Sequence, residues 1–217
     1  MTTLWLTRHA ESANPTVFHG AESNIGLSAL GHRQAAAAAS WFRDRQPTAV
    51  VSSAMIRARE TAGPIAAACG VPHLIEPDLH ERRVGALGGT SFSSQSGPWH
   101  DTIHRWMAGD TAYTTPGAES FDELTARLVP AMERIAKRFP DGRTVVVAHG
   151  VVCKALLLSL LEGRSPADWQ TLGKVMNLAA SELRFNGKTW TAGALLEVPP
   201  PVAALQAEAT TGEKSQA

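Results

Sequence analysis

The sequence predicts an α/β protein, a three-layer sandwich with a mostly parallel central sheet flanked by helices. Four short runs of β-branched or aliphatic residues alternate with longer stretches in which apolar residues recur every three to four positions, a rhythm typical of βαβ units. A late Asn-Gly pair between two runs of strand formers adds an antiparallel hairpin. With 217 residues, 44% of them hydrophobic, the chain can bury one sizeable core.

The parallel strands and the first helices follow one another in order. The four strand-forming runs begin at Leu4, Thr48, Val71 and Thr144. Ser28 is a good N-cap residue, so the first helix should begin there and end before Pro47. The second should span about Met55 to Cys69 and end at Gly70, because glycine tolerates the left-handed conformation of a helix C-terminus.

The second half of the chain carries equally clear signals. Ser120 and Glu123 have the spacing of a capping box and precede an amphipathic helix. Another helix should start just after His149 and Gly150, and Ser165-Pro166 should open a short one. Asn186-Gly187 marks the turn of the late hairpin.

One catalytic domain should occupy residues 1–197. The segment 88–116, rich in Gly, Ser, Thr and Trp, breaks the α/β rhythm and is interpreted as an insertion or lid over a site. Residues 198–217 begin with three prolines and continue through small and polar residues without periodicity, so we expect a flexible C-terminal tail.

Composition excludes several classes of protein. Twenty Lys and Arg balance twenty Asp and Glu, which argues against a nucleic-acid partner or a charged membrane surface. No apolar run reaches the ~20 residues of a membrane span, and the N-terminus lacks the pattern of a signal peptide. The two cysteines, Cys69 and Cys153, form at most one disulfide, which fits a cytoplasmic protein in a reducing environment.

Four polar clusters lie just after predicted strands, where α/β sheets place their functional residues. These clusters are Arg8-His9, Ser52-Ser53 with Arg57, Glu81-Arg82 and His149-Gly150. A single His or Arg in such a place is usually a solvated loop residue. Four clusters at one sheet edge indicate a site that binds an anion.

Competing chemistries lack their motifs. No GxxxxGK[ST] or GxGxxG follows a strand, and neither cysteine has an Arg six positions later, as a cysteine phosphatase needs. The eight histidines include no HxH or HExxH, so the sequence predicts neither a metal site nor a cofactor. Imidazole as the nucleophile toward phosphorus remains, with Arg guanidinium groups to stabilise charge on the phosphoryl oxygens.

The clusters resemble the histidine phosphatase superfamily, also called the phosphoglycerate-mutase-like family. Leu6-Thr7-Arg8-His9-Ala10-Glu11-Ser12 is similar to its L-x-R-H-G-E-[ST] signature. The resemblance continues through Leu27-Ser28, Arg57 to Ala62, Leu79 to Arg82, Pro116 to Ser120 and Val147 to Gly150, in family order. It spans nearly the whole chain except the tail.

The resemblance implies a role for each residue that matches the motif. His9 would be the nucleophile, Arg8, Arg57 and His149 would form the phosphate pocket, and Glu81 would give a proton to the leaving oxygen. Further candidates for phosphate or substrate binding are Ser12, Asn14, Arg82, Trp99 and Arg105. Arg59 should be a surface charge, because two residues along a helix it points away from Arg57. Ala10 replaces the usual glycine, which strains the turn only if its φ is positive.

The expected function is a metal-independent, histidine acid phosphatase-like phosphomonoesterase that acts on a small phosphorylated metabolite through a phosphohistidine. A phosphoglycerate-mutase-type phosphoryl transferase, a non-catalytic phosphate-binding regulatory module and a metal-dependent phosphodiesterase are the alternatives. The run from His149 to Lys154 differs from the H-G-N-S-[LF]-R run of mutases, which favours hydrolysis. The substrate stays open, as does the oligomeric state, with a dimer among the options.

Overall fold

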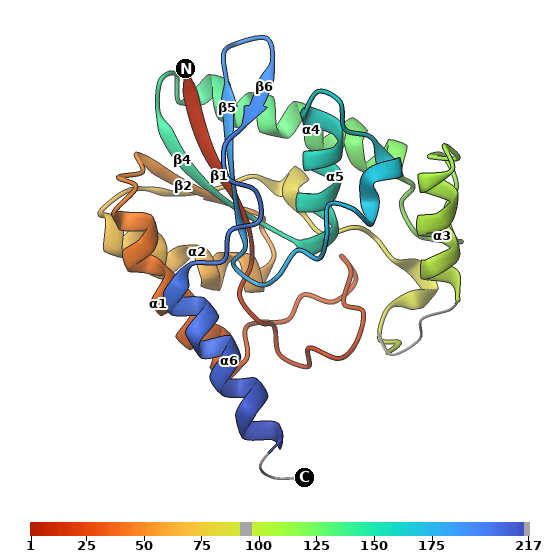
Figure 1. Cartoon of the computed structure of the whole chain (residues 1–217), viewed down its shortest axis with the longest axis horizontal. Helices are drawn as coiled ribbons and strands as arrows, with labels where there is room; N and C mark the ends of the chain where they lie inside the picture. The colour runs from red at the N-terminus through yellow and green to blue at the C-terminus, as the bar shows by residue number, and fades with distance from the viewer. Residues whose placement is uncertain (92–96, 215–217) are drawn as a thin grey trace.

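Six strands form one mixed sheet in the computed structural model, which describes residues 1–91 and 97–214 (Figure 1). The strands are β1 (Thr2–Arg8), β2 (Ala49–Ser52), β3 (His73–Ile75), β4 (Arg143–Ala148), β5 (Ala180–Phe185) and β6 (Trp190–Ala192). Their order is β3-β2-β4-β1-β5-β6. The first four strands of the chain run parallel, whereas β5 is antiparallel to β1 and β6 is antiparallel to β5. This confirms the predicted fold class.

Helices cover both faces of the sheet and complete the three layers. One apolar cluster includes residues of α1 (Ala29–Arg43), α2 (Ile56–Cys69) and α6 (Pro200–Lys214), and the other includes residues of α3 (Pro98–Met107), α4 (Phe121–Arg138) and α5 (Gly150–Leu160). The 3-10 helices η1 (Pro77–Leu79), η2 (Gly85–Leu87) and η3 (Pro166–Trp169) lie in connections. Within residues 1–91 and 97–214, no helix combines the length and apolar character that a bilayer crossing needs.

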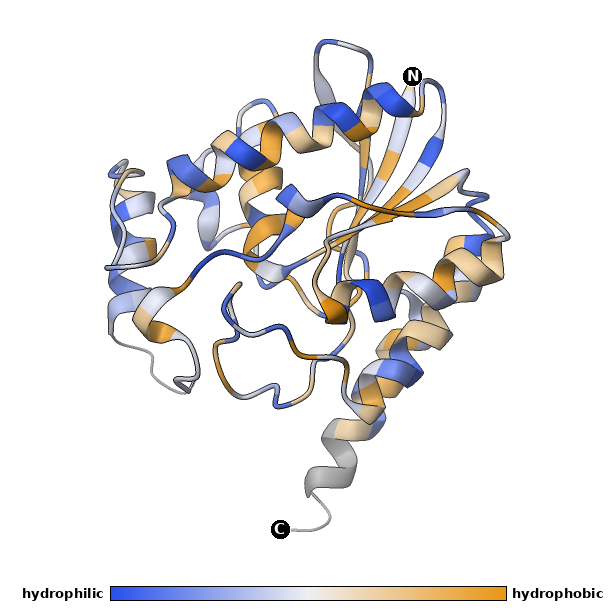
Figure 2. Cartoon of the chain, turned by 180° about the vertical axis from the view of Figure 1, so that it is seen from behind, coloured by the Kyte–Doolittle hydropathy of each residue, from blue (hydrophilic) through white to orange (hydrophobic). Residues whose placement is uncertain are grey.

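Alternation along β1 explains why the sheet is buried on both faces. Leu4 and Leu6 join the cluster under α4 and α5, whereas Trp5 joins the cluster under α1 and α2. Successive strand residues point to opposite faces, and each buried leucine contributes about 1.5–3 kcal/mol. Figure 2 shows hydrophobic residues concentrated on the strands and on the helix sides turned toward them. The packing fixes the register of β1, and therefore the position of the residues that follow it.

The helix boundaries confirm the capping predictions. The Ser28 side chain accepts a hydrogen bond from the Gly31 backbone N–H, and Ser120 and Glu123 form a capping box. Gly70 ends α2 with a left-handed φ of 65°. These caps satisfy backbone groups that a helix end leaves without intrahelical partners.

The late hairpin lies where the Asn-Gly pair predicts it. Phe185 of β5 lies opposite Trp190 of β6, and the Asn186 side-chain oxygen accepts hydrogen bonds from the backbone N–H groups of Lys188 and Thr189. Gly187 has a φ of 97°, which a side chain would oppose. The turn therefore holds β5 beside β1.

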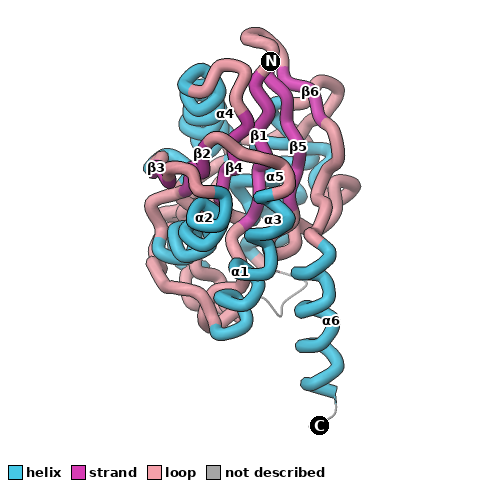
Figure 3. Tube along the Cα trace, turned by 90° about the vertical axis from the view of Figure 1, so that its left-hand side faces the viewer, coloured by secondary structure: helices cyan, strands magenta, loops and turns pink. Residues whose placement is uncertain are grey.

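The C-terminal region differs from its prediction. Of the tail expected over 198–217, residues Pro200–Lys214 form α6, and 215–217 lie outside the described residues. Prolines at the start of a helix lose only N–H groups that have no partner within the helix, so the proline run begins α6 instead of preventing it. Buried Val202 packs in the cluster of α1 and α2, and the far end of α6 extends away from the body (Figure 3).

Candidate active site

Two histidines meet where β1 and β4 end. The strands are parallel and in register, with Arg8 opposite Ala148, and the His9 backbone N–H donates to the Ala148 carbonyl at 2.9 Å. His149, the next residue after β4, is the N-cap of α5. The two imidazole centroids lie 5.2 Å apart in an edge-on arrangement. Strand pairing therefore brings together histidines that are far apart in the sequence.

Two arginines complete this cluster. Arg57 lies in the first turn of α2, and its guanidinium donates to the backbone carbonyls of Ser23 and Gly20 at 2.8 and 2.9 Å. Arg8 donates through Nη1 to the Val175 carbonyl at 2.9 Å, while its buried Nε has no partner among the described residues. Both guanidinium groups are anchored on one side and keep donors available for an anion.

The protonation of His9 follows from its contacts. Its Nδ1 lies 2.6 Å from the Ala10 carbonyl oxygen, which can only accept, so Nδ1 carries the hydrogen and Nε2 keeps a lone pair. Burial, Arg8 and Arg57 hold the pKa of His9 well below its ordinary value. The imidazole is therefore neutral, as a nucleophile must be.

The buried His149 imidazole is held neutral in the same way. Burial comes first among the causes that keep its pKa well below the ordinary value, followed by the charge of Arg57. Neither ring nitrogen has a hydrogen-bond partner among the residues that the structure describes. Buried polar atoms of this kind are normally paired, so the ring is poised to bind a ligand oxygen.

Both histidines should remain neutral in mildly acidic solution. A depressed pKa means that the folded protein takes up these protons only below the ordinary value of about 6.5. In an NMR titration with ¹³C-histidine in phosphate-free buffer, the Cε1–H resonances of His9 and His149, assigned with His9→Ala and His149→Ala, should keep neutral-form shifts at pH 6. The urea-unfolded chain is the control. A titration midpoint at or above the ordinary value for either residue would contradict this account.

Glu81, in the connection between η1 and η2, lines the same pocket as Arg8, His9 and Arg57. Its Oε1 accepts a hydrogen bond from the Arg82 backbone N–H at 2.8 Å, and its Oε2 accepts one from the Val151 N–H at 3.3 Å. Val151 belongs to the first turn of α5, whose positive end favours a carboxylate. The carboxyl group is thus fixed beside the histidine and arginine cluster.

Arg8, His9, Arg57 and Glu81 line one pocket of about 570 Å³, a volume typical of small-molecule sites, whereas the fully buried His149 packs against His9 and is not among the lining residues. Arg8, His9, Arg57 and Glu81 form its polar end. Apolar walls come from the segment after β1, the connection before η2, the predicted insertion and the start of α5, and comprise Pro15, Val17, Phe18, Val84, Trp99 and Val151. The Phe18 and Trp99 rings contact edge to face with centroids 6.1 Å apart.

The predicted insertion 88–116 contributes one wall residue, Trp99 of α3, to this pocket. Residues 92–96 of the insertion lie outside the described residues. Trp106, two turns after Trp99, is fully buried and packs against Phe121 and Trp169. The α3 segment is therefore anchored in the core on one side and reaches the pocket through Trp99.

The structure places the remaining candidates differently. Ser12 lines the pocket, but Asn14, Arg82 and Arg105 do not. Asn14 has a left-handed φ of 51° and accepts a hydrogen bond from Thr16, a local turn contact. Arg105 is exposed on α3 and pairs with Asp110 at 3.2 Å. The expectation that Arg105 and Asn14 lie at the phosphate pocket is thus corrected.

Arg82 points away from the pocket into an aromatic cluster. It is fully buried, its guanidinium carbon lies 5.1 and 5.2 Å from the ring centroids of Trp99 and Trp106, and its Nε donates to the Glu119 carbonyl. Burial lowers the pKa of its guanidinium to about 10. Its contacts hold α3 and the wall residue Trp99 in place.

The structure accounts for three further residues named in the sequence analysis. Ala10 is buried, is absent from the residues with positive φ, and its N–H donates to Thr61 Oγ1 at 3.0 Å. Its methyl group therefore causes no backbone strain. Arg59 is exposed, as expected for a surface charge. Cys153 is free and buried, and burial raises the pKa of its thiol, which leaves it unreactive.

One side of the pocket mouth is not marked by any signal in the sequence. Lys174, Met176 and Asn177, in the connection between η3 and β5, line the pocket. The Asn177 side-chain amide donates to the His9 carbonyl at 2.9 Å, and the Asn177 carbonyl accepts from Gln206 of α6. Neither a motif nor periodicity marks this connection. Among the described residues, no three His, Cys, Asp or Glu side chains gather as a metal site would require.

Fold and site together define an α/β protein with a pocket of histidine, arginine and carboxylate side chains at the carboxyl ends of its parallel strands. The chain belongs to the histidine phosphatase superfamily (branch 1), whose sequence profile matches residues 4–196. It is a phosphatase- or mutase-type enzyme. This confirms the resemblance carried by the motif around His9.

Several known proteins are similar to it. A metal-independent phosphoserine phosphatase of Arabidopsis thaliana is 32% identical over 194 residues, 88% of this chain and 79% of that protein. A probable phosphoglycerate mutase of Photorhabdus laumondii is 28% identical over 88% of this chain and 89% of its own. A solved mycobacterial glucosyl-3-phosphoglycerate phosphatase is 26% identical with a TM-score of 0.78, covering 91% and 99%. The chain spans 51% of a bifunctional protein of Mycobacterium tuberculosis, at 31% identity.

Proposed function

We propose that this chain is a metal-independent phosphomonoester hydrolase that forms a phosphohistidine at His9. The observation that carries the proposal is the arrangement around one nitrogen. His9 lines the pocket, and its Nδ1 is committed to the Ala10 carbonyl. Nε2 is thereby the nucleophilic atom, beside Arg8, Arg57 and His149. Residues 1–197 would form the catalytic domain.

In the first step, His9 Nε2 attacks phosphorus and the bond to the ester oxygen breaks. The negative charge on the phosphoryl oxygens is stabilised by the two guanidinium groups and by His149, whose unpaired ring nitrogens gain a partner. Glu81, in its protonated form, donates a proton to the leaving oxygen, so that an alcohol departs. Phosphate charge also favours the protonated imidazole of His149, because an opposite charge raises the pKa of a histidine.

In the second step, water attacks the phosphohistidine and the P–N bond breaks. The Glu81 carboxylate takes one proton of the attacking water, which restores its acid form for the next turnover. Inorganic phosphate leaves, and His9 returns to the neutral form. The carboxylate is well placed for both proton transfers because two backbone N–H groups hold its oxygens.

The pocket beyond the phosphate end suits a small ester with an apolar portion. Its walls include Phe18 and Trp99, and its mouth carries Lys174. Relatives named for phosphoserine and for glucosyl-3-phosphoglycerate support a small phosphorylated metabolite as the substrate class. The insertion around Trp99 would set which leaving group is accepted, while the strand-end residues set the chemistry.

Hydrolysis is favoured over a mutase reaction by what surrounds the phosphate end. A mutase must retain the phosphoryl group and bind a second anionic group. Beyond Arg8 and Arg57, the described lining offers one strong cation, Lys174, which is exposed at the mouth. Val151, an apolar residue, follows His149-Gly150 at the pocket surface where mutases carry an asparagine. Water should therefore be the acceptor.

Phosphatase activity should persist in the presence of a chelator, because guanidinium and imidazole groups supply the charge stabilisation that a metal would otherwise provide. Release of phosphate from p-nitrophenyl phosphate and from a panel that includes phosphoserine and glucosyl-3-phosphoglycerate should be measured with and without EDTA. A zinc-dependent phosphatase in the same buffer shows that the chelator works. Loss of activity in EDTA and its return with a divalent ion would refute metal independence, and transfer to 3-phosphoglycerate faster than to water would favour the mutase.

A further inference from the structure

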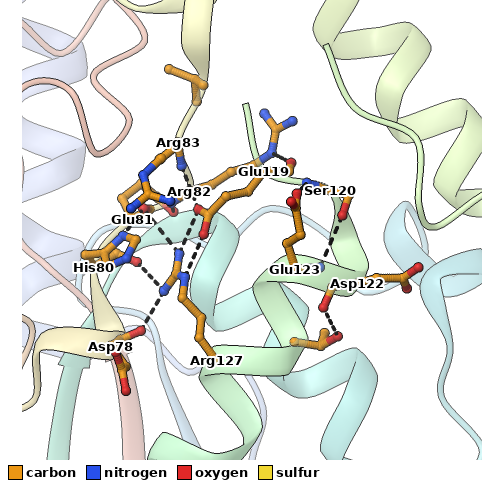
Figure 4. A network of polar contacts seen from close by, with 12 residues as sticks. Asp78, His80, Glu81, Arg82, Arg83, Glu119, Ser120, Asp122, Glu123 and Arg127 are labelled. Carbon is orange, nitrogen blue, oxygen red and sulfur yellow. Dashed lines mark hydrogen bonds and ion pairs between the residues drawn. The ribbon is translucent and has the colours of Figure 1, made fainter. Parts of the chain in front are cut away.

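A polar network behind the pocket encloses the segment that carries Glu81 (Figure 4). At its centre lies Arg127 of α4, whose side chain is 15% exposed. Its guanidinium donates to three backbone carbonyls in this segment: Asp78 at 2.5 Å, His80 at 3.0 Å and Glu81 at 3.4 Å. One rigid group on a helix thus holds the backbone from residue 78 to residue 81, which includes the carbonyl of Glu81 itself.

The other partner of Arg127 holds the C-terminal side. Glu119 accepts a two-pronged interaction from Arg127, with Oε1 to Nε at 2.8 Å and Oε2 to Nη2 at 2.9 Å. The same Oε2 accepts a hydrogen bond from the Arg83 backbone N–H at 2.8 Å. The Arg127–Glu119 pair therefore clasps the chain at residues 78–81 and again at residue 83.

The position of this clasp matters because the Glu81 side chain has few anchors of its own. Its carboxylate accepts one hydrogen bond from the backbone N–H of the adjacent Arg82 and one longer hydrogen bond from the backbone N–H of Val151. The placement of the carboxyl group over the pocket therefore depends on the backbone of residues 80–83. That backbone runs as a connection between η1 and η2, without strand or α-helix hydrogen bonds to fix it.

We propose that Arg127, through Glu119, is a positioning residue for the Glu81 general acid. The inference deepens the proposed function and rests on it. Neither Arg127 nor Glu119 lines the pocket itself, so the pair acts through its contacts with the backbone that bears Glu81.

The charge state of Glu119 favours a stable ion pair with Arg127. Burial alone would disfavour the charged form of Glu119, but hydrogen bonds from Arg127 and from the Arg83 N–H outweigh burial and lower the pKa of the carboxyl group. A buried carboxylate with a bidentate guanidinium is among the stronger and more directional ion pairs. Lysine at position 127 could keep the charge but not the fork.

The experiment compares two substrates that differ in their need for a general acid, p-nitrophenyl phosphate and an alkyl phosphate. The proteins tested are wild type, Arg127→Met, Arg127→Lys, Glu119→Gln, Glu81→Gln and the double variant Glu81→Gln/Arg127→Met. The matched control is Arg134→Met, on the same helix, whose exposed guanidinium binds the side chains of Glu76 and Asp78 but none of these carbonyls. The quantity measured is the ratio of kcat/KM for the two substrates, since kcat/KM covers the step in which the leaving group departs.

Arg127→Met should lower kcat/KM for the alkyl phosphate about 10- to 100-fold more than for p-nitrophenyl phosphate, because misplacing a catalytic group by about 1 Å can cost 10²-fold. Arg127→Lys and Glu119→Gln should show the same bias to a smaller degree, and Arg134→Met should show none. In the Glu81→Gln background, Arg127→Met should add no further bias, because the group that it positions is already absent.

Other outcomes distinguish a failure of this inference from a failure of the proposed function. An equal loss on both substrates in Arg127→Met and Arg127→Lys, with a lower melting temperature, would make the pair purely structural and overturn this inference. Additive bias in the double variant would overturn it as well. No leaving-group bias in Glu81→Gln would instead overturn the assignment of Glu81 as the acid, and an inactive wild type would overturn the proposed function.

Discussion

His9→Ala is expected to lower phosphatase activity by at least about 10³-fold, because it removes the only atom that we assign as nucleophile. The neighbouring groups cannot replace it. Cys153 is buried with a raised thiol pKa, and His149, the N-cap of α5, does not line the pocket. The variant should still bind phosphate, since Arg8 and Arg57 keep the hydrogen bonds that anchor them.

The measurement has two parts. Initial rates with p-nitrophenyl phosphate give the loss of activity. Alkaline quench after reaction with a ³²P substrate retains a phosphohistidine label, which later treatment with acid should remove. His100→Ala, an exposed histidine on α3, serves as the matched control and should label like wild type. Equal labelling of His9→Ala and wild type would assign the nucleophile to another residue.

Glu81→Gln should have the second largest effect, and its size should depend on the substrate. A general acid contributes about 10²- to 10⁴-fold where the departing oxygen needs a proton, and far less where it does not. Hydrolysis of an alkyl phosphate should therefore fall by that factor, while hydrolysis of p-nitrophenyl phosphate should fall much less. Glutamine keeps one oxygen acceptor, so the shorter hydrogen bond from the Arg82 N–H can survive, while the longer one from the Val151 N–H, which goes to the other oxygen, is lost.

A series of aryl and alkyl phosphates provides the measurement. The slope of log kcat/KM against the pKa of the leaving group should be steeper in Glu81→Gln than in wild type. Glu22→Gln is a suitable control, because Glu22 also receives backbone N–H bonds in this region but lies outside the pocket lining. Parallel slopes in wild type and Glu81→Gln would make Glu81 a positioning group and remove it as the acid.

Sequence signals located the elements because each depends on neighbouring residues. Ser28, Gly70 and the Asn186-Gly187 pair each fix a local conformation, and the structure confirms all three. The order of the strands was not predictable in this way, since β1 lies between β4 and β5 through hydrogen bonds to distant segments. The helix α6 was missed for a different reason. It buries Val202 but has little apolar periodicity, and its opening prolines indicated a break.

The same distinction between local signals and long-range contacts applies to the residues of the site. Arg8, His9, Arg57, Glu81 and the His149 ring come together because strand ends converge, a rule that can be applied to a sequence. Arg105 was misplaced because it is six residues from Trp99 on α3, which at 100° per residue puts it on a different face, whereas Trp106 at seven residues shares the face of Trp99. Asn177 and Arg127 act through backbone carbonyls, and such contacts leave no pattern in the sequence.

The pairing of β1 with β4 also determines at which stage of synthesis and folding the site can assemble. Thr3 pairs with Arg143 and Arg8 with Ala148, so each bond of this ladder closes a loop of 140 residues. The entropy lost in closing such a loop precedes any gain from the contacts, and structures dominated by distant pairings fold slowly. A ribosome-bound chain that has emerged only as far as α4 contains the His9 strand but not its β4 or β5 neighbours. Catalytic competence therefore arrives only with the last third of the chain.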